Sequence, residues 1–163
     1  MTFEAQREIM GLFATGVTVI GTRVGDETWG MTANAFTSLS LDPPLVLVCV
    51  DNTKATHEKM SAGKCFSVNL LKADQVELSN RFAFKGPRDF SDLDVITEVT
   101  GAPILKDSLG YVDCETHEIL SGGDHDIFVG RIVAGKVLSD DAEPLLYYRG
   151  GYAALAKPEA SDG

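Results

Sequence analysis

Residues 30–50 read GMTANAFTSLSLDPPLVLVCV, and this stretch decides the fold. Its last part, residues 45–50, is a near-continuous apolar run of strand length, which is typical of a strand covered on both faces. We therefore expect this run to form the centre of the core. Asp42-Pro43-Pro44 comes directly before it and forbids a helix, because proline has no backbone N–H and restricts the residue that precedes it.

The part of this stretch from Met31 to Ser40 is rich in hydroxyl and amide side chains, whereas the flanking strands are apolar. Two interpretations stay open from the residues alone. A ligand with many acceptor atoms and little positive charge, such as an isoalloxazine ring with its ribityl chain, can be held by such donors and by backbone N–H groups. Alternatively, the segment is a polar strand and turn whose side chains satisfy their own backbone.

On both sides of this stretch, segments with the apolar pattern of a strand alternate with segments that have the apolar spacing of a helix. β-branched runs and hairpin turns predict strands over 15–22, 65–70, 111–120, 127–138 and 145–148. Helical spacing predicts helices over 3–13, leaning on the core, over 53–61, stopped by Gly63, and over 72–84. Residues 85–100 lack a stable period and are expected to form an exposed excursion, either a lid or a dimer arm. Because regular βαβ alternation is missing, we predict a mainly β fold, a β-barrel with peripheral α-helices.

Length and composition indicate a single globular domain. The chain has 163 residues and a formal net charge of -10, and this acidic excess disfavours nucleic acid and anionic membranes as partners. The N-terminus lacks the layout of a signal peptide, and no apolar run approaches the roughly 18 residues of a membrane span, so we expect a cytoplasmic protein. Cys49, Cys65 and Cys114 form no C-x-x-C pair and are expected to be reduced, buried and small hydrophobes.

Several familiar chemical motifs are missing from the sequence. It contains neither a G-x-G-x-x-G fingerprint nor a P-loop, which argues against a Rossmann or P-loop nucleotide site. Its three histidines, His57, His117 and His125, are scattered, and none has a second histidine at metal-ligand spacing, so no metal site is expected. Hydride transfer is cofactor chemistry that needs no side-chain nucleophile, so the lack of a catalytic triad is compatible with it.

Several separated segments resemble the short-chain flavin reductase family, in the same order along the chain. They are residues 13–20 (FATGVTVI), 30–46 (GMTANAFTSLSLDPPLV), 66–71 (FSVNLL), 123–130 (GDHDIFVG) and 144–152 (PLLYYRGGY). The resemblance implies an FMN-binding split β-barrel, Greek-key-like, over residues 1–156, with a flexible tail over residues 157–163. It also implies a homodimer that transfers hydride from NADH or NADPH to FMN or FAD and supplies reduced flavin to a partner monooxygenase.

The resemblance further implies where the cofactors bind. Residues 32–38 would line the isoalloxazine ring and ribityl chain, and residues 51–56 would lie beside the phosphate or adenine end of the flavin. His125 matches the family position that contacts the nicotinamide cofactor. The implied flavin contacts are Met31, Thr32, Ala33, Asn34, Ala35, Thr37, Ser38, Ser40, Asp51, Asn52, Thr53, Lys54, Thr56, Arg81, Phe82 and Lys85. The implied contacts near the nicotinamide are Gly123, Asp124, His125, Tyr148 and Tyr152.

The sequence departs from the family pattern at Ala35, where many relatives carry Ser, and at Ala14, where many carry Pro. The first departure removes a hydroxyl donor to the flavin, and the choice between FMN and FAD stays open. Two alternatives on the same barrel also stay open: an enzyme that keeps its flavin bound, similar to pyridoxamine-phosphate oxidases, and a flavin-binding protein without activity. Taken alone, His125 can equally be a turn histidine satisfied by its acidic neighbours.

Overall fold

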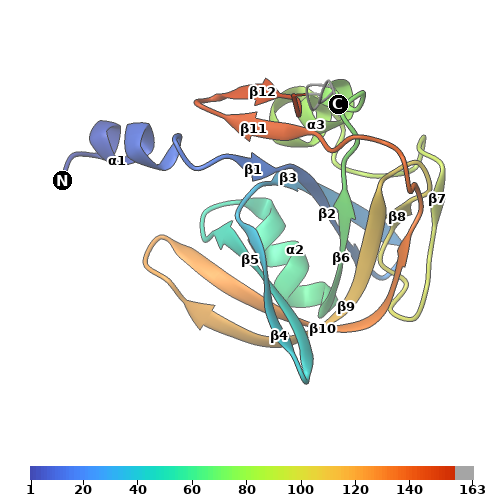
Figure 1. Ribbon diagram of the computed structural model, residues 1–163. Helices are drawn as coiled ribbons and strands as arrows, with labels where there is room; N and C mark the ends of the chain where they lie inside the picture. Colours follow the sequence, from blue (N-terminus) through green and yellow to red (C-terminus); the bar gives the residue numbers. More distant parts are fainter. Residues whose placement is uncertain (157–163) are drawn as a thin grey trace.

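A computed structural model describes residues 1–156, apart from the side chain of Lys85, and the predicted tail, residues 157–163, lies outside the described residues. Seven antiparallel strands form one sheet in the order β3-β2-β6-β9-β10-β5-β4. In Figure 1 this sheet curves around helix α2, Ala55–Gly63. The bounds of its strands are β2 Thr18–Val24, β3 Glu27–Ala33, β4 Phe36–Leu41, β5 Pro44–Asp51, β6 Cys65–Leu70, β9 Gly110–Ser121 and β10 His125–Val137.

The barrel is split between its two edge strands. These strands, β3 and β4, follow each other in the sequence and are joined only by Asn34 and Ala35. The polar stretch of the sequence therefore crosses the side of the barrel where the sheet does not close. The predicted mainly β class and split barrel are confirmed.

The inside of the barrel is the main core. Val48 of β5, Phe66 of β6, Phe128 of β10 and Met60 of α2 are fully buried in it. Strand β5 alternates between buried and half-buried residues, so the prediction that it is covered on both faces is wrong. Only its valine face packs in the barrel, and the other face, which includes Cys49, is half-buried.

Three short strands form a second sheet beside the barrel. It contains β1 (Thr15–Gly16), β11 (Leu146–Tyr148) and β12 (Gly151–Ala153), in the order β1-β11-β12. The predicted strand over 15–22 is thus divided between two sheets, and β12 was not predicted. The hairpin between β11 and β12 turns at Arg149 and Gly150, whose φ angles are 50° and 75°.

Two helices differ from their predictions. Helix α1 spans Phe3–Met10, has no buried residue, and projects away from the barrel, so it does not lean on the core (Figure 1). Helix α2 is not stopped by a left-handed Gly63, because Lys64 takes that conformation with φ 54°. A side chain at Gly63 would place its Cβ 2.5 Å from the Arg23 carbonyl oxygen, so the close approach of β2 requires glycine there.

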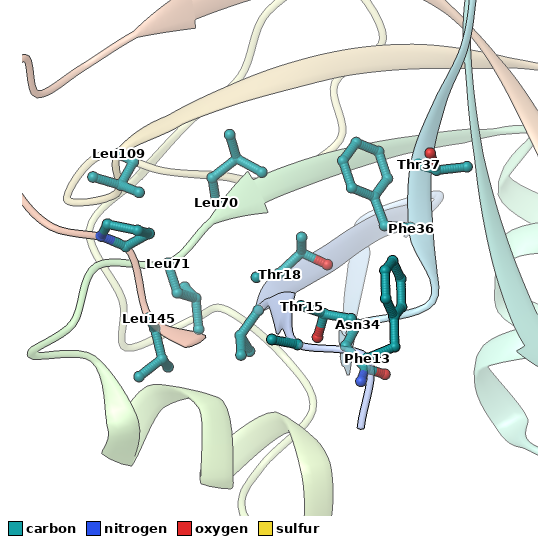
Figure 2. Close-up of a pocket in the computed structure, with 14 residues that line it drawn as sticks. Phe13, Thr15, Thr18, Asn34, Phe36, Thr37, Leu70, Leu71, Leu109 and Leu145 are labelled. Carbon is teal, nitrogen blue, oxygen red and sulfur yellow. The ribbon is translucent and has the colours of Figure 1, made fainter. Parts of the chain in front are cut away.

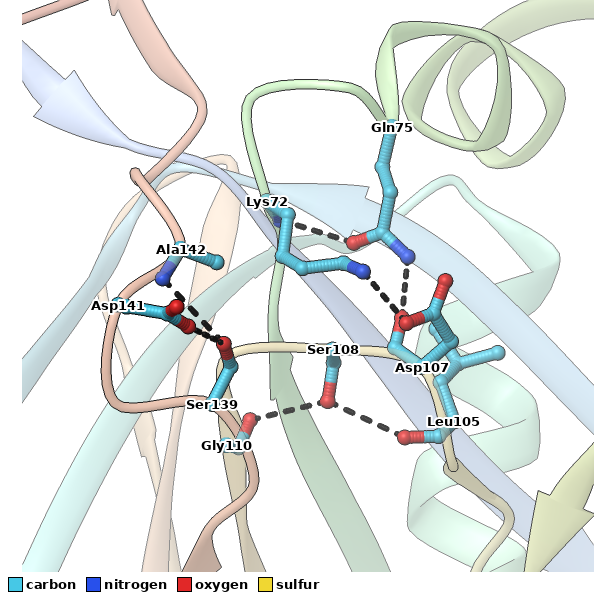
Figure 3. Close-up of polar contacts among 9 residues, drawn as sticks. All are labelled: Lys72, Gln75, Leu105, Asp107, Ser108, Gly110, Ser139, Asp141 and Ala142. Carbon is cyan, nitrogen blue, oxygen red and sulfur yellow. Dashed lines mark hydrogen bonds and ion pairs between the residues drawn. The ribbon is translucent and has the colours of Figure 1, made fainter.

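The predicted helix over 72–84 is shorter and irregular. It consists of α3 (Val76–Asn80) followed by a π-helix, η1 (Arg81–Lys85). In place of its expected first turn, the Gln75 side chain accepts a hydrogen bond from the Lys72 backbone N–H at 2.8 Å and donates one to the Asp107 carbonyl. Figure 3 shows these hydrogen bonds together with the ion pair between the Lys72 ammonium and the Asp107 carboxylate. This ion pair raises the pKa of Lys72. The chain before α3 is thereby tied to the loop before β9.

The segment 85–100 packs on the barrel rather than forming an exposed excursion. Phe90 is buried and stacks on Phe82, with ring centroids 4.8 Å apart. Arg81 donates to both carboxylate oxygens of Asp92, at 2.8 and 2.6 Å. The segment contains β7 (Val95–Ile96), which pairs with β8 (Ile104–Leu105). The Phe90 backbone N–H donates to the Thr28 hydroxyl of β3 at 3.1 Å, and such a contact between residues far apart in the sequence is invisible to local periodicity, which explains the error.

The three cysteines are free thiols. Cys65 and Cys114 are buried, as predicted, and burial raises the pKa of the Cys114 thiol to about 12. Cys49 is only half-buried. Across residues 1–156, none of the helices has the length and apolar character that crossing a membrane requires.

Candidate functional site

A cleft of about 710 Å³ opens where the barrel is split. It is bounded by the end of β3, the link to β4, the end of β5, the start of α2, the π-helix and the first residue of β10. Its lining brings together ten of the predicted contacts: Met31, Thr32, Ala33, Asn34, Ala35, Asp51, Lys54, Thr56, Phe82 and His125. We call this hollow the cleft.

One wall of the cleft is the free edge of β3. The backbone N–H of Gly30 points out from this edge and donates to the Arg88 carbonyl at 2.7 Å. Because N–H groups alternate in direction along a strand, that of Thr32 points out from the same edge. The Thr32 hydroxyl donates to the Ser79 carbonyl at 2.6 Å, so its proton is committed to α3 and its oxygen is left as an acceptor. This wall thus offers the Thr32 backbone N–H as a donor to a flat ligand.

The end of β5 and the start of α2 form the polar end of the cleft. Lys54, the N-terminal cap of α2, lines the cleft together with Ala55 and Thr56, so the electropositive first turn of the helix borders it, and Lys54 makes no side-chain cap hydrogen bond there. Thr56 accepts a hydrogen bond from the Trp29 indole at 2.9 Å, which leaves its own proton to donate elsewhere. An anionic group such as a phosphate suits this end.

Asp51 carries the negative charge nearest to this end. Its Oδ1 accepts hydrogen bonds from the Thr53 hydroxyl at 2.7 Å and the Thr53 backbone N–H at 2.8 Å. These bonds, with the nearby charges of Lys54 and His125, hold the pKa of the Asp51 carboxyl below its usual value. Asp51 therefore stays ionised and anchors the turn that leads into α2.

His125 begins β10 and lies opposite Asp51 in the strand register. Its Nδ1 donates to the Asp124 carboxylate at 2.7 Å, which fixes the ring and leaves Nε2 for a second partner. The next residue, Asp126, is bonded to His57 Nε2 at 2.7 Å, and this contact ties β10 to α2. His125 thus lies at the rim of the cleft with its ring oriented by Asp124.

The π-helix and the residues after it close the opposite end. The Arg88 guanidinium lines the cleft and donates to the carbonyls of Phe82 and Ala83, which caps the π-helix. Phe84, also in the π-helix, is 75% exposed although it is a large aromatic residue. π-Helical turns occur frequently at functional sites.

The remaining predicted contacts lie outside the cleft lining. Thr37 lines a different hollow, and Ser38 and Ser40 lie along the edge strand β4. Asn52 and Thr53 secure the turns at Gly123 and Asp51 instead, with Asn52 donating to the Gly123 carbonyl at 3.3 Å. Arg81 is engaged by Asp92, and Tyr148 accepts a hydrogen bond from Arg149. Asp124 supports His125 from outside, and the side chain of Lys85 lies outside the described residues.

Tyr152 lies in a second hollow of about 370 Å³ beneath the β11–β12 hairpin, which we call the hairpin hollow. It shares Thr32, Asn34, Ala83 and Phe84 with the cleft, so the two hollows adjoin along one wall.

Sequence reasoning missed six residues of the cleft lining. These are Trp29, Cys49, Ala55, Ala83, Phe84 and Arg88. Arg88 could have been suspected from the sequence, since it is one of few cations in an acidic chain and follows a predicted helix. The other five look like ordinary core or helix residues in the sequence. Within residues 1–156, no group of three His, Cys, Asp or Glu side chains is arranged to hold a metal ion.

The model of the flavin reductase like domain matches residues 10–156 of this chain. The chain is 38% identical over 162 residues to an NADH-dependent FAD reductase of Streptomyces globisporus, which covers 96% of this chain and 87% of that protein. It is 37% identical over 154 residues to the flavin-dependent monooxygenase reductase subunit HsaB of Mycobacterium tuberculosis, covering 94% of this chain and 82% of that one. The solved structure of the flavin reductase PheA2 superposes with a TM-score of 0.86 at 39% identity, covering 96% of this chain and all of that chain.

Proposed function

The chain belongs to the flavin reductase like family, and from that premise we propose that it transfers hydride from a dihydronicotinamide cofactor to FMN or FAD bound in the cleft. The cleft at the barrel split is the observation that carries this proposal, because ten residues of the predicted cofactor contacts line it together. Relatives with these activities, an NADH-dependent FAD reductase among them, support the same reaction.

The residues of the cleft fit a flavin. Thr32, through its backbone N–H on the free edge of β3, and Asn34, in the link to β4, would hold the ring, where donors would favour the electron-rich reduced form. Lys54, Thr56 and the first turn of α2 face the phosphate. A bound flavin supplies the hydride acceptor, and the protein's own task is to hold it with one face open.

The second cofactor approaches from the open side of the cleft. His125 orients it through Nε2, while Asp124 fixes the histidine ring through Nδ1. His125 would thus position the nicotinamide beside the flavin, and such positioning would replace any need for a protein nucleophile. The binding should be moderate, since Lys54 and Arg88 are the only Lys or Arg side chains among the described residues that line the cleft.

A steady-state assay tests this proposal. Protein in catalytic amount is mixed with NADH or NADPH and with FMN, FAD or riboflavin, and dihydronicotinamide absorbance is followed. We expect oxidation that depends on both added flavin and protein. If no combination of nicotinamide and flavin is turned over, the proposed function is wrong.

The active form is a homodimer. An eight-residue helix such as α1 is marginal on its own, and here it exposes Phe3, Ile9 and Met10, so a second copy must cover it. Next to it lies an apolar hollow of about 410 Å³. Figure 2 shows the hollow with Leu70, Leu71, Leu109 and Leu145 on one side and Phe13 and Phe36 on the other.

Analytical ultracentrifugation tests the homodimer. The wild-type protein should sediment as a dimer, Phe13→Glu should weaken the dimer, and the control Glu4→Gln should leave it intact. A monomeric wild-type protein would refute the proposal.

The reduced flavin passes to a partner monooxygenase. One relative is named as the reductase subunit of a flavin-dependent monooxygenase, which supports this destination. An open cleft with few cations also suits a flavin that must leave. The three free thiols fit a reducing compartment, the cytoplasm.

A further inference from the structure

We propose that Trp29 is a positioning residue that gives the cleft a preference for FMN, which carries a phosphate, over riboflavin, which carries none. The inference rests on the proposed reductase function and extends it, because it explains which flavins the cleft selects. Trp29 is the single tryptophan of the chain, lies in β3 and lines the cleft. It acts through the hydroxyl of Thr56.

The indole of Trp29 sets the direction of one hydroxyl proton at the polar end of the cleft. Its Nε1–H donates to Thr56 Oγ1 at 2.9 Å. An indole N–H can only donate, so the Thr56 oxygen is the acceptor in this bond and the Thr56 proton points away from the indole. Thr56 also lines the cleft, and a phosphate oxygen placed at this end is an acceptor for that proton.

Without the indole, the Thr56 hydroxyl has a competing partner in its own helix. A serine or threonine in a helix can donate to the backbone carbonyl of the preceding turn. Ser61, also in α2, does so, and its hydroxyl donates to the His57 carbonyl at 2.8 Å. At Thr56 the hydroxyl is held by Trp29 instead, and its proton stays available to a ligand.

The indole is itself held between β3 and α2. The Lys59 ammonium lies 5.8 Å from the centroid of the Trp29 ring, where the ring attracts a cation. Lys59 also pairs with the Glu27 carboxylate at 2.9 Å. Glu27 and Trp29 lie two positions apart in β3 and therefore face the same side of the strand. The Thr56 hydroxyl thus has its orientation before a ligand binds, and a donor fixed in advance loses less entropy on binding.

A neutral donor is important at this end of the cleft because the cationic charge there is weak. The Lys54 side chain is 66% exposed, and its ammonium lies 4.0 Å from the Asp51 carboxylate, so part of its charge is already balanced. Thr56, in contrast, is only 6% exposed. A hydrogen bond to a charged group is stronger where water is excluded. The oriented Thr56 hydroxyl therefore contributes a large part of the discrimination between FMN and riboflavin.

Equilibrium binding of FMN and riboflavin, measured by calorimetry, tests the proposal without turnover. The quantity compared is the phosphate preference, defined as the dissociation constant of riboflavin divided by that of FMN. Trp29→Phe keeps an aromatic ring and removes the indole donor. We expect it to lower the phosphate preference by about tenfold, the value of one hydrogen bond to a charged group.

Two further variants show whether Trp29 acts through Thr56. Thr56→Val removes the hydroxyl from a side chain of the same shape and should lower the phosphate preference to the same extent. In the double variant, the change at Trp29 should have no additional effect, because the hydroxyl that it orients is gone.

Tyr111→Phe is the matched control. It also removes an aromatic donor, the hydroxyl that donates to Glu98 Oε1 at 2.7 Å, but Tyr111 lies outside the lining of the cleft. This variant should keep the phosphate preference of the wild-type protein.

An unchanged phosphate preference in Trp29→Phe would overturn the proposal, since a purely structural role would weaken both flavins alike. Losses that add up in the double variant would overturn it as well. In either case the reductase function stands as long as the wild-type protein oxidises dihydronicotinamide with added flavin. If the preferences change as expected but no dihydronicotinamide is oxidised, the reductase function fails while the role of Trp29 stands. Wild-type protein that binds neither flavin would overturn both.

Discussion

Gly30→Ala should destabilise the protein and weaken flavin binding together. A Cβ at Gly30 would lie 2.5 Å from Cε1 and 2.7 Å from Cδ1 of Phe82, and 2.8 Å from Cε2 of Phe90. Both rings are buried and stacked, so neither can move aside freely. Overpacking of this kind costs about 1–3 kcal/mol. For a domain of this size that cost lowers the melting temperature by roughly 2–4 °C per kcal/mol.

The same substitution should disturb the cleft, because Phe82 belongs to the π-helix that walls it. Thermal unfolding by circular dichroism measures the loss of stability, and KM for FMN measures the effect on the cleft. Gly16→Ala is the matched control, since a Cβ there would meet no atom within 4 Å. If Gly30→Ala melts with the wild-type protein and keeps its KM, the packing argument is wrong.

Three other perturbations have defined outcomes. His125→Ala should raise KM for NADH by about tenfold, the value of one hydrogen bond, and leave KM for FMN nearly unchanged; steady-state kinetics would contradict the assignment if both constants rose equally. The ion pair with Arg81 holds the pKa of Asp92 below its usual 3.8, so its contribution to stability is present above that pH and is lost as the pH falls through the lowered pKa. Urea unfolding should therefore separate Asp92→Asn from the wild-type protein at pH 6, and the difference should shrink as the pH falls below 3.8; a constant difference would contradict this. Burial raises the pKa of both the Cys49 and the Cys114 thiol, but Cys49 is half-buried and lines the cleft whereas Cys114 is fully buried with a pKa of about 12. Cys49 should therefore react slowly with a maleimide and be protected by FMN, and Cys114 should stay unreactive in the folded protein; mass spectrometry of the modified peptides decides.

Local sequence patterns were sufficient for the strands with strongly apolar or β-branched runs, and insufficient for the polar edge strands β3 and β4, the short strands β7, β8 and β12, and the helix over 72–84. The strand over 65–70 was predicted with its observed bounds, because a β-branched and aromatic run between turn signals carries its own information. The segment 72–84 has a helical period in the sequence, yet Lys72 and Gln75 are hydrogen-bonded to Asp107 in a distant loop. The residues after the π-helix are likewise held by the Gly30 backbone N–H, which donates to the Arg88 carbonyl. Such contacts join residues far apart in the chain and leave no local trace.

The candidate site shows the same division. The polar stretch from Met31 to Ala35 could be recognised because hydroxyl and amide groups are unusual between apolar strands. Which arginine faces the cleft could not be decided from the sequence. Asp92 engages Arg81, and the Gly30 N–H holds the backbone of Arg88 beside the cleft. Because of these tertiary contacts, Arg88 lines the cleft, whereas Arg81, seven positions earlier in the sequence, does not.

The most direct test of the account is the crystal structure of the protein with FMN bound. We expect electron density for the isoalloxazine ring along the edge of β3 at Thr32 and Asn34, with the phosphate at Lys54 and the start of α2. FMN found elsewhere on the surface, or a cleft that stays free of FMN in crystals of protein saturated with it, would contradict the central claim that the split of the barrel is the flavin site.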